Sequence, residues 1–272
     1  MKQIPNLTPR HLAAALRAGV AATAALALAA CFEMDQDVSL SKDGSGTIEM
    51  KTVFGAQIAP MLEMGAAEGG GNPLEDLKDA AKMAEQAANM GEGVEFVEAR
   101  DLEFNDGRKG VAATFRFADI NNLRINLNES PGDEEEDTAP ANLTFQFTPG
   151  DTSKLVIQMP PMEAGDAPAQ AAEAAEGMDE AAMAMMAPMM QGMRVGMSIT
   201  VDGEIVNTNA SHTEGNKIIL MDMDMGKLVA NADAMKKLGS PDALQDFSQF
   251  ATVAKEAGLK VETEQNIEVE FK

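Results

Sequence analysis

Cys31, the only cysteine of the chain, offers the clearest chemistry in the sequence. It follows Leu28-Ala29-Ala30 at the end of an apolar run that begins at Val20. Three positive charges precede the run: Lys2, Arg10 and Arg17. A basic segment, a short apolar segment and small residues before the cut together describe a secretory signal. A membrane-spanning helix needs about 20 apolar residues, so this run is too short to be one. We therefore expect residues 1–30 to be removed on export, which leaves a thiol at the new N-terminus.

Residues 28–31 resemble the lipobox of bacterial lipoproteins, in which a diacylglyceryl group is transferred to the cysteine sulfur. The resemblance implies that the mature protein begins at Cys31, with acyl chains on its sulfur and amine that give stable membrane attachment. Phe32 follows, where many inner-membrane lipoproteins of proteobacteria have Asp. This favours the outer membrane, on its periplasmic side, if the cell has two membranes. The alternative is a plain secretory signal followed by a buried cysteine.

Methionine is the second unusual feature, and it is concentrated in residues 178–193. Thioether groups are soft ligands that suit Cu(I), but this segment contains no histidine or cysteine to strengthen such a site. Methionine also fills irregular cores and lines adaptable apolar surfaces. Three interpretations stay open: ordinary packing, a groove or partner surface, and copper binding. The residues that we assign to a groove or partner surface are Met183, Met186, Met190 and Met193.

The inventory of catalytic residue types argues against an enzyme. Once residues 1–30 are removed, the remaining histidine is His212, which lies in the polar turn 210–213. Ser-His or Cys-His chemistry needs a histidine beside the nucleophile. The chain has no HExxH, P-loop or GxSxG motif. We therefore expect no catalytic residue, no cofactor and no metal site.

The charge of the chain limits its partners. The formal net charge is −23, and removal of residues 1–30 takes away three positive charges and no acidic residue, which gives −26. Such a negative field disfavours nucleic acid and broad contact with anionic lipid. Since no second cysteine is present, no intramolecular disulfide can form, and the apolar core must hold the fold.

Residues 31–272 predict a single α+β ectodomain, with an antiparallel sheet of about eight to ten strands and two or three helices packed on one face. Residues 34–54 alternate apolar and polar side chains around Asp43-Gly44, and residues 94–117 repeat this hairpin pattern around Asn105-Asp106-Gly107. One helix is predicted from Asn72-Pro73 to Gly91 and another from Ser240-Pro241 to Gly258. Two segments interrupt the pattern: the acidic loop 129–141 and the Ala/Pro/Met-rich segment 160–193.

Two groups of residues resemble the LppM-like family of bacterial lipoproteins. One is the first predicted strand together with Asp43-Gly44-Ser45-Gly46, which follows it in the sequence. The other is Gly203-Glu204-Ile205-Val206, then Asn209-Ala210, then Gly215-Asn216 before a strand. Members often carry Trp in that strand, and this chain has none. The resemblance implies a membrane-tethered α+β ectodomain that faces the envelope space, with lipid or apolar-ligand binding as its suspected activity and no catalysis.

The expected function is therefore that of a non-enzymatic envelope lipoprotein that binds a lipid or another apolar ligand between sheet and helices. The alternative is an interaction or structural lipoprotein that docks on an envelope protein through residues 178–193. Cu(I) handling is a third interpretation. The expected partners are the membrane, through the lipid on Cys31, and either an apolar ligand or an envelope protein, but no nucleic acid.

Overall fold

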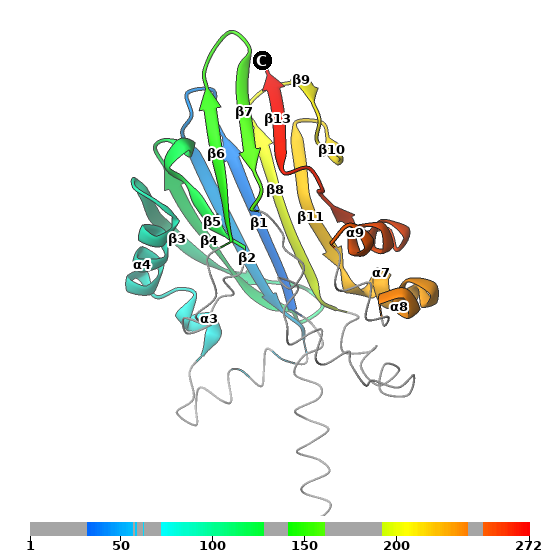
Figure 1. Cartoon of the computed structure of the whole chain (residues 1–272). Helices are drawn as coiled ribbons and strands as arrows, with labels where there is room; N and C mark the ends of the chain where they lie inside the picture. The colour runs from blue at the N-terminus through cyan, green and yellow to red at the C-terminus, as the bar shows by residue number, and fades with distance from the viewer. Residues whose placement is uncertain are drawn as a thin grey trace, which may run out of the picture.

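The computed structural model describes residues 32–56, 58, 62, 72–127, 141–160, 192–238 and 247–272. Within these ranges the chain forms thirteen strands in two sheets and five short α-helices (Figure 1).

The larger sheet has eight strands. Their order is β10 (Thr213–Glu214), β11 (Lys217–Asp224), β8 (Arg194–Val201), β1 (Phe32–Leu40), β2 (Gly46–Phe54), β4 (Lys109–Phe117) and β3 (Val94–Glu103), with β12 (Lys260–Val261) paired to β11. Both predicted hairpins, β1–β2 and β3–β4, are confirmed. In the first turn, the Asp43 carboxylate accepts hydrogen bonds from the N–H and the hydroxyl of Ser45, at 3.0 and 2.6 Å. Strands β1 and β8, far apart in the sequence, pair in parallel.

The smaller sheet has five strands. Their order is β5 (Arg124–Asn126), β6 (Asn142–Thr148), β7 (Ser153–Gln158), β13 (Asn266–Phe271) and β9 (Ile205–Thr208). The chain enters this sheet from β8 through Gly203, which has φ +149°. A Cβ atom on Gly203 would meet the carbonyl oxygen of Lys272 at 2.0 Å. Only glycine permits that approach and that backbone conformation. The C-terminal strand, β13, is held within the sheet, between β7 and β9.

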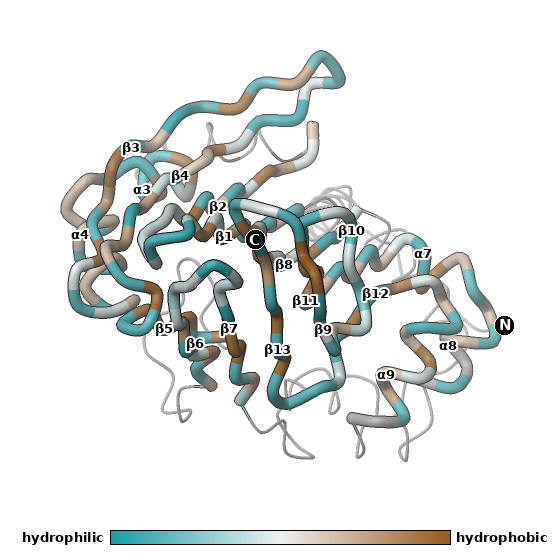
Figure 2. The backbone as a smooth tube through the Cα atoms, turned by 90° about the horizontal axis from the view of Figure 1, so that it is seen from above, coloured by the Kyte–Doolittle hydropathy of each residue, from teal (hydrophilic) through white to brown (hydrophobic). Residues whose placement is uncertain are grey.

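The two sheets pack face to face around a shared core, and Figure 2 shows them as two layers. The large sheet contributes fully buried side chains that include Val38, Ile48, Phe115 and Ile199. The small sheet contributes Leu143, Leu155, Ile157, Ile267 and Phe271. The rings of Phe147 and Phe271 stack with centroids 6.2 Å apart. Burial of these apolar side chains is the main favourable contribution to folding.

The helices lie at two opposite sides of this sandwich (Figures 1 and 2). On one side are α3 (Pro73–Asp76) and α4 (Ala80–Met90); on the other are α7 (Met225–Ala230), α8 (Ala232–Leu238) and α9 (Phe247–Glu256). The predicted cap at Asn72 is confirmed, since its side-chain oxygen accepts the Leu74 N–H at 3.1 Å. However, Asp79 caps a second helix by accepting the Ala81 N–H at 2.8 Å. The single helix that we predicted there is therefore two helices.

The predicted fold class is wrong. We expected an α+β domain with one antiparallel sheet and helices on one face, whereas the described structure is mostly β, with sheets of eight and five strands. Apolar alternation identifies a strand and the face that it buries, but it does not identify its partners. Strands β6 and β7 do not join the first sheet, because they pair with each other, and β7 also pairs with β13.

Candidate functional site

Most residues that the sequence singled out lie outside the described part of the chain. These are Leu28, Ala29, Ala30, Cys31, Met183, Met186 and Met190. Met193 is described: it is half-buried just before β8, and its carbonyl oxygen accepts the Met225 N–H at 2.9 Å. The roles predicted for these residues stay predictions.

Strand β1 begins at Phe32, so its first residues mark the end of the large sheet nearest to Cys31. Phe32 pairs with Phe54, the last residue of β2. Glu33 pairs with Arg194 at the start of β8, and Arg194 pairs with Asp224 at the end of β11. We call this end of the large sheet the anchor end.

Five methionines gather on the inner face of the large sheet, next to the anchor end. They are Met34, Met50, Met197, Met221 and Met223, from four neighbouring strands. Met197 pairs directly with Met221, and Met197 also pairs with Gln36, whose other partner is Met50. Residues two apart on a strand share a face, so these side chains lie on the same face as the core residues Val38 and Ile199. We call these five residues the methionine surface.

Burial changes along this inner face. Val38, Ile48 and Ile199 have no exposed surface, whereas Met34, Met50, Met221 and Met223 are half-buried. Figure 1 shows the reason: β6, β7 and β13 lie over the half of the large sheet that is away from the anchor end. The methionine surface therefore begins where the cover of the second sheet stops.

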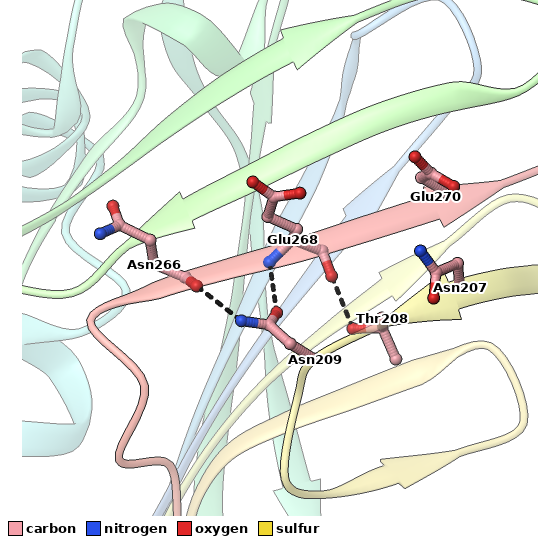
Figure 3. Close-up of a pocket in the computed structure, with 6 residues that line it drawn as sticks. All are labelled: Asn207, Thr208, Asn209, Asn266, Glu268 and Glu270. Atoms are coloured by element: carbon pink, nitrogen blue, oxygen red, sulfur yellow. Dashed lines mark hydrogen bonds between the residues drawn. The ribbon is translucent and has the colours of Figure 1, made fainter.

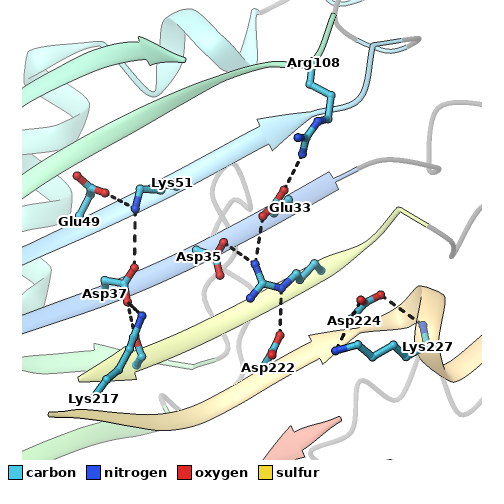
Figure 4. A network of polar contacts seen from close by, with 12 residues as sticks. Glu33, Asp35, Asp37, Glu49, Lys51, Arg108, Lys217, Asp222, Asp224 and Lys227 are labelled. Carbon is cyan, nitrogen blue, oxygen red and sulfur yellow. Dashed lines mark hydrogen bonds and ion pairs between the residues drawn. The ribbon is translucent and has the colours of Figure 1, made fainter. Parts of the chain in front are cut away.

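The outer face of the same strands carries a network of charges (Figure 4), and the contacts of Arg194 place it at the centre. Its guanidinium group lies 3.2 Å from Glu33, 3.2 Å from Asp35 and 3.0 Å from Asp222. Gly196 makes room for this arrangement, since a Cβ atom there would meet the Oδ1 atom of Asp35 at 2.1 Å. The network thus joins β1, β8 and β11 at the anchor end.

Asp35 and Asp37, two residues apart on this face of β1, have opposite pKa shifts. Burial raises the pKa of Asp35, and Glu33 adds to this rise while Arg194 counteracts it. Burial acts in the same direction on Asp37, but its hydrogen bonds with Lys217, at 2.7 Å, and with the Ser198 hydroxyl outweigh burial and lower the pKa of Asp37. Only Asp37 is therefore held in a site that favours the ionised carboxylate.

A small polar hollow lies between β9 and β13 (Figure 3). It is lined by Asn207, Thr208, Asn209, Asn266, Glu268 and Glu270. The Asn209 side chain continues the strand ladder, because its oxygen accepts the Glu268 N–H at 2.7 Å and its amide donates to the Asn266 carbonyl at 2.9 Å. The volume is about 230 Å³, whereas small-molecule sites are mostly apolar and span about 300–1,000 Å³. The hydrogen bonds of Asn209 therefore complete the end of β9. The hollow beside them is smaller and more polar than a typical ligand site.

A buried carboxylate that the sequence patterns did not indicate lies between β12 and β13. Glu262 is 1% exposed. It accepts hydrogen bonds from the N–H and the hydroxyl of Ser211, at 2.7 and 2.9 Å, and from the N–H groups of Thr263 and Glu264, at 2.8 and 3.1 Å. Buried charges need such partners. Glu262 thus links the segment between β12 and β13 to the loop after β9 through its hydrogen bonds with Ser211.

The described residues show no arrangement for metal binding. Within them, no group of three or more His, Cys, Asp or Glu side chains could hold a metal ion. None of the helices in the described ranges is both long and apolar enough to cross a membrane. His212 is half-buried, and its carbonyl oxygen accepts the Ile219 N–H at 2.9 Å.

Comparisons with known proteins do not assign this chain to a family. No protein-family model matches the chain, and a search of curated proteins found no match. Among solved structures, the chain is similar to the folded domain of the Mycobacterium tuberculosis protein LppM, determined by NMR. The identity is 8%, the match covers 89% of this chain and 90% of that chain, and the TM-score is 0.32. This is a weak structural relationship, from which we draw no conclusion about function.

The residues of the predicted LppM resemblance have structural roles in this chain. Gly203 lets the chain pass Lys272, and Asn209 completes the ladder of β9. The Asn216 side-chain amide donates to the Val201 carbonyl at 2.7 Å. The methionine surface itself was missed, because its members come from four strands whose order the sequence does not reveal. One signal was visible: Met221-Asp222-Met223 alternates as in a half-buried strand, and Met221 packs against the core from β11.

Proposed function

We propose that this chain is a membrane-anchored envelope lipoprotein, attached through Cys31, whose ectodomain binds a lipid or another apolar ligand without catalysing a reaction. If the cell has two membranes, we place it at the outer membrane, facing the periplasm, because Phe32 and not Asp follows Cys31. The observation that carries the ligand proposal is the methionine surface beside the anchor end, where Met34, Met50, Met221 and Met223 are half-buried and Met197 is buried.

The chemistry of this surface suits an acyl chain or a similarly flexible apolar group. Methionine is unbranched and polarizable, so it adapts to ligands of irregular shape. Burial of apolar surface contributes about 25 cal/mol per Å², and the half-buried side chains still have surface to bury. Gln36 lies among them, and Gln86 of α4 donates a hydrogen bond to the Met50 sulfur at 3.8 Å. These two amides place polar groups next to the methionine side chains.

The position of the surface also favours a membrane lipid as the ligand. Phe32 is the first residue of β1, and Met34 lies two residues further along the same strand. A lipid on Cys31 would therefore hold the methionine surface close to the bilayer, where lipids are the most abundant apolar molecules.

The test starts from the full-length precursor, expressed in a bacterial host and purified from the envelope in mild detergent. Native mass spectrometry, followed by organic extraction, is expected to release a lipid in stoichiometric amount. The double variant Met221→Gln/Met223→Gln should lose this lipid, because it places two amides on the methionine surface. Val206→Gln changes an exposed residue of β9 and should retain it. An apo mass for protein taken from its native envelope would contradict ligand binding.

Anchoring is tested separately with Cys31→Ser. The wild-type chain is expected to carry the added mass of diacylglyceryl and acyl groups on its N-terminal residue and to sediment with membranes. The variant should lack this mass and leave the membrane fraction. Normal membrane association of Cys31→Ser, with no difference in mass, would refute the proposed anchor and leave the plain secretory signal as the interpretation.

A further inference from the structure

We infer that the anchor end of the large sheet is a membrane-contact surface, where Phe104 and the paired rings of Phe32 and Phe54 enter the interface between lipid headgroups and acyl chains. This inference rests on the proposed lipid anchor at Cys31. It goes further by naming the surface of the ectodomain that touches the bilayer.

The first argument is the length of the tether. Phe32 is already part of β1, where it pairs with Phe54. Consecutive Cα atoms are 3.80 Å apart, so a lipid on Cys31 leaves no flexible linker between the bilayer and the sheet. β1 is hydrogen-bonded to β2 on one side and to β8 on the other. The anchor end therefore faces the membrane directly.

The second argument is that aromatic side chains gather at this end. The rings of Phe32 and Phe54 lie 5.6 Å apart and are both half-buried. Phe104 lies in the β3–β4 turn, which leads into Lys109, and Lys109 pairs with Phe54. The Phe104 side chain is 37% exposed and is among the few large apolar side chains exposed in the described ranges. Helices and segments that lie in the membrane interface use such apolar side chains as anchors.

The third argument is that the carboxylate of Glu33, at the same end, is paired with two arginines. The chain is strongly acidic, yet Glu33 is paired with Arg108 at 3.0 Å and with Arg194 at 3.2 Å. Arg108 also contacts Asp106 at 2.8 Å and lies 4.5 Å from the centroid of the Phe104 ring. Figure 4 shows Arg108 reaching across to Glu33. Paired carboxylates are repelled less by an anionic surface and cost less to bring near a medium of low dielectric constant than unpaired ones. The same contacts hold the β3–β4 turn against the start of β1.

The test uses the absence of tryptophan from the chain, which makes an introduced tryptophan the sole indole reporter. The Phe104→Trp variant is expressed as the full-length precursor, and the lipidated product is reconstituted into phosphatidylcholine vesicles with or without brominated acyl chains. Its emission is expected to shift to shorter wavelength, to be quenched by brominated lipid and to be protected from iodide in solution. The matched control is Val206→Trp, at another exposed apolar residue, in the small sheet away from the anchor end. It should show the opposite response.

The outcomes separate this inference from the proposed function. If Cys31 carries lipid and the protein floats with vesicles, but brominated lipid leaves the Phe104→Trp emission unchanged, the membrane-contact surface is wrong and the anchor stands. Protection from iodide without quenching by lipid would also overturn the inference, because it would indicate a protein contact at this turn. If Cys31 carries no lipid, the proposed anchor fails, and the inference fails with it.

Discussion

Replacing Asp37 by Asn should destabilise the fold, whereas the same replacement of Asp35 should not. The two residues lie on the same face of β1, and both side chains are less than one third exposed, at 22% and 29%. Asn has nearly the shape of Asp and keeps one oxygen that accepts hydrogen bonds. The comparison therefore changes charge and leaves packing almost constant.

For Asp37→Asn we expect a loss of about 1–2 kcal/mol in the free energy of unfolding at neutral pH, since a hydrogen bond to a charged group contributes about 1.5–3 kcal/mol and partial exposure reduces this. The variant loses the ion pair with Lys217 at 2.7 Å and the longer contact with Lys51 at 3.8 Å. For a domain of this size, 1 kcal/mol corresponds to about 2–4 °C in Tm. Asp35→Asn should be as stable as the parent chain or more stable, because burial disfavours the Asp35 charge.

The two pKa shifts also predict how the stability of the fold depends on pH. The pKa of Asp37 is lowered in the folded state, so its stabilisation is present above the ordinary pKa of Asp, near 3.9, and is lost as the pH falls through the lowered value. The pKa of Asp35 is raised, so its contribution is favourable at low pH and is lost as the pH rises through the raised value. Urea unfolding followed by circular dichroism between about pH 3 and 7 measures both. Equal destabilisation by the two variants at neutral pH would refute this assignment of charges.

Three further substitutions test the small sheet, each by thermal and urea unfolding. Gly203→Ala should destabilise by at least about 2 kcal/mol, because alanine is strained at φ +149° and its Cβ atom would meet the Lys272 carbonyl; a change below experimental error would contradict this. Asn209→Ala should cost about 1–3 kcal/mol through the loss of two side-chain hydrogen bonds to β13, whereas Asn207→Ala, in the same hollow, serves as the milder control. Glu262→Gln should lower the free energy of unfolding by about 2–3 kcal/mol, since the introduced amide NH₂ would face an N–H donor. Unchanged stability would show that the charge of Glu262 is not needed.

Individual strands were predictable because each carries its own signal. The β1–β2 hairpin combines strict alternation with Asp43-Gly44, and the β3–β4 hairpin repeats this around Asp106-Gly107. The assembly of strands was not predictable in the same way. The parallel pairing of β1 with β8 and the insertion of β13 between β7 and β9 depend on contacts between distant residues. Local patterns do not encode these contacts, which is why two sheets were mistaken for one.

In the candidate site, too, some features follow from the local sequence, and others arise only when distant strands pair. Alternation placed Met221 on the inner face, but nothing local indicated that Met34, Met50 and Met197 would come to lie beside it. Glu262 gave no signal either, since the residues that follow it, Thr263 and Glu264, are polar and its partner Ser211 is distant in the sequence. Of the methionine-rich segment 178–193, the structure describes only the last two residues, Gly192 and Met193.

The place of β1 in the sheet links the anchor to the proposed ligand surface. β1 is an inner strand, hydrogen-bonded along its length to β2 and to β8. A lipid on Cys31 would therefore be attached to one of the most constrained strands of the domain and not to a flexible terminal arm. Since Met34 and Glu33 point to opposite faces of that strand, the anchor would fix both faces relative to the bilayer. The methionine surface would then meet lipid in one orientation, so lengthening the connection between Cys31 and Phe32 should weaken lipid binding even where anchoring is retained.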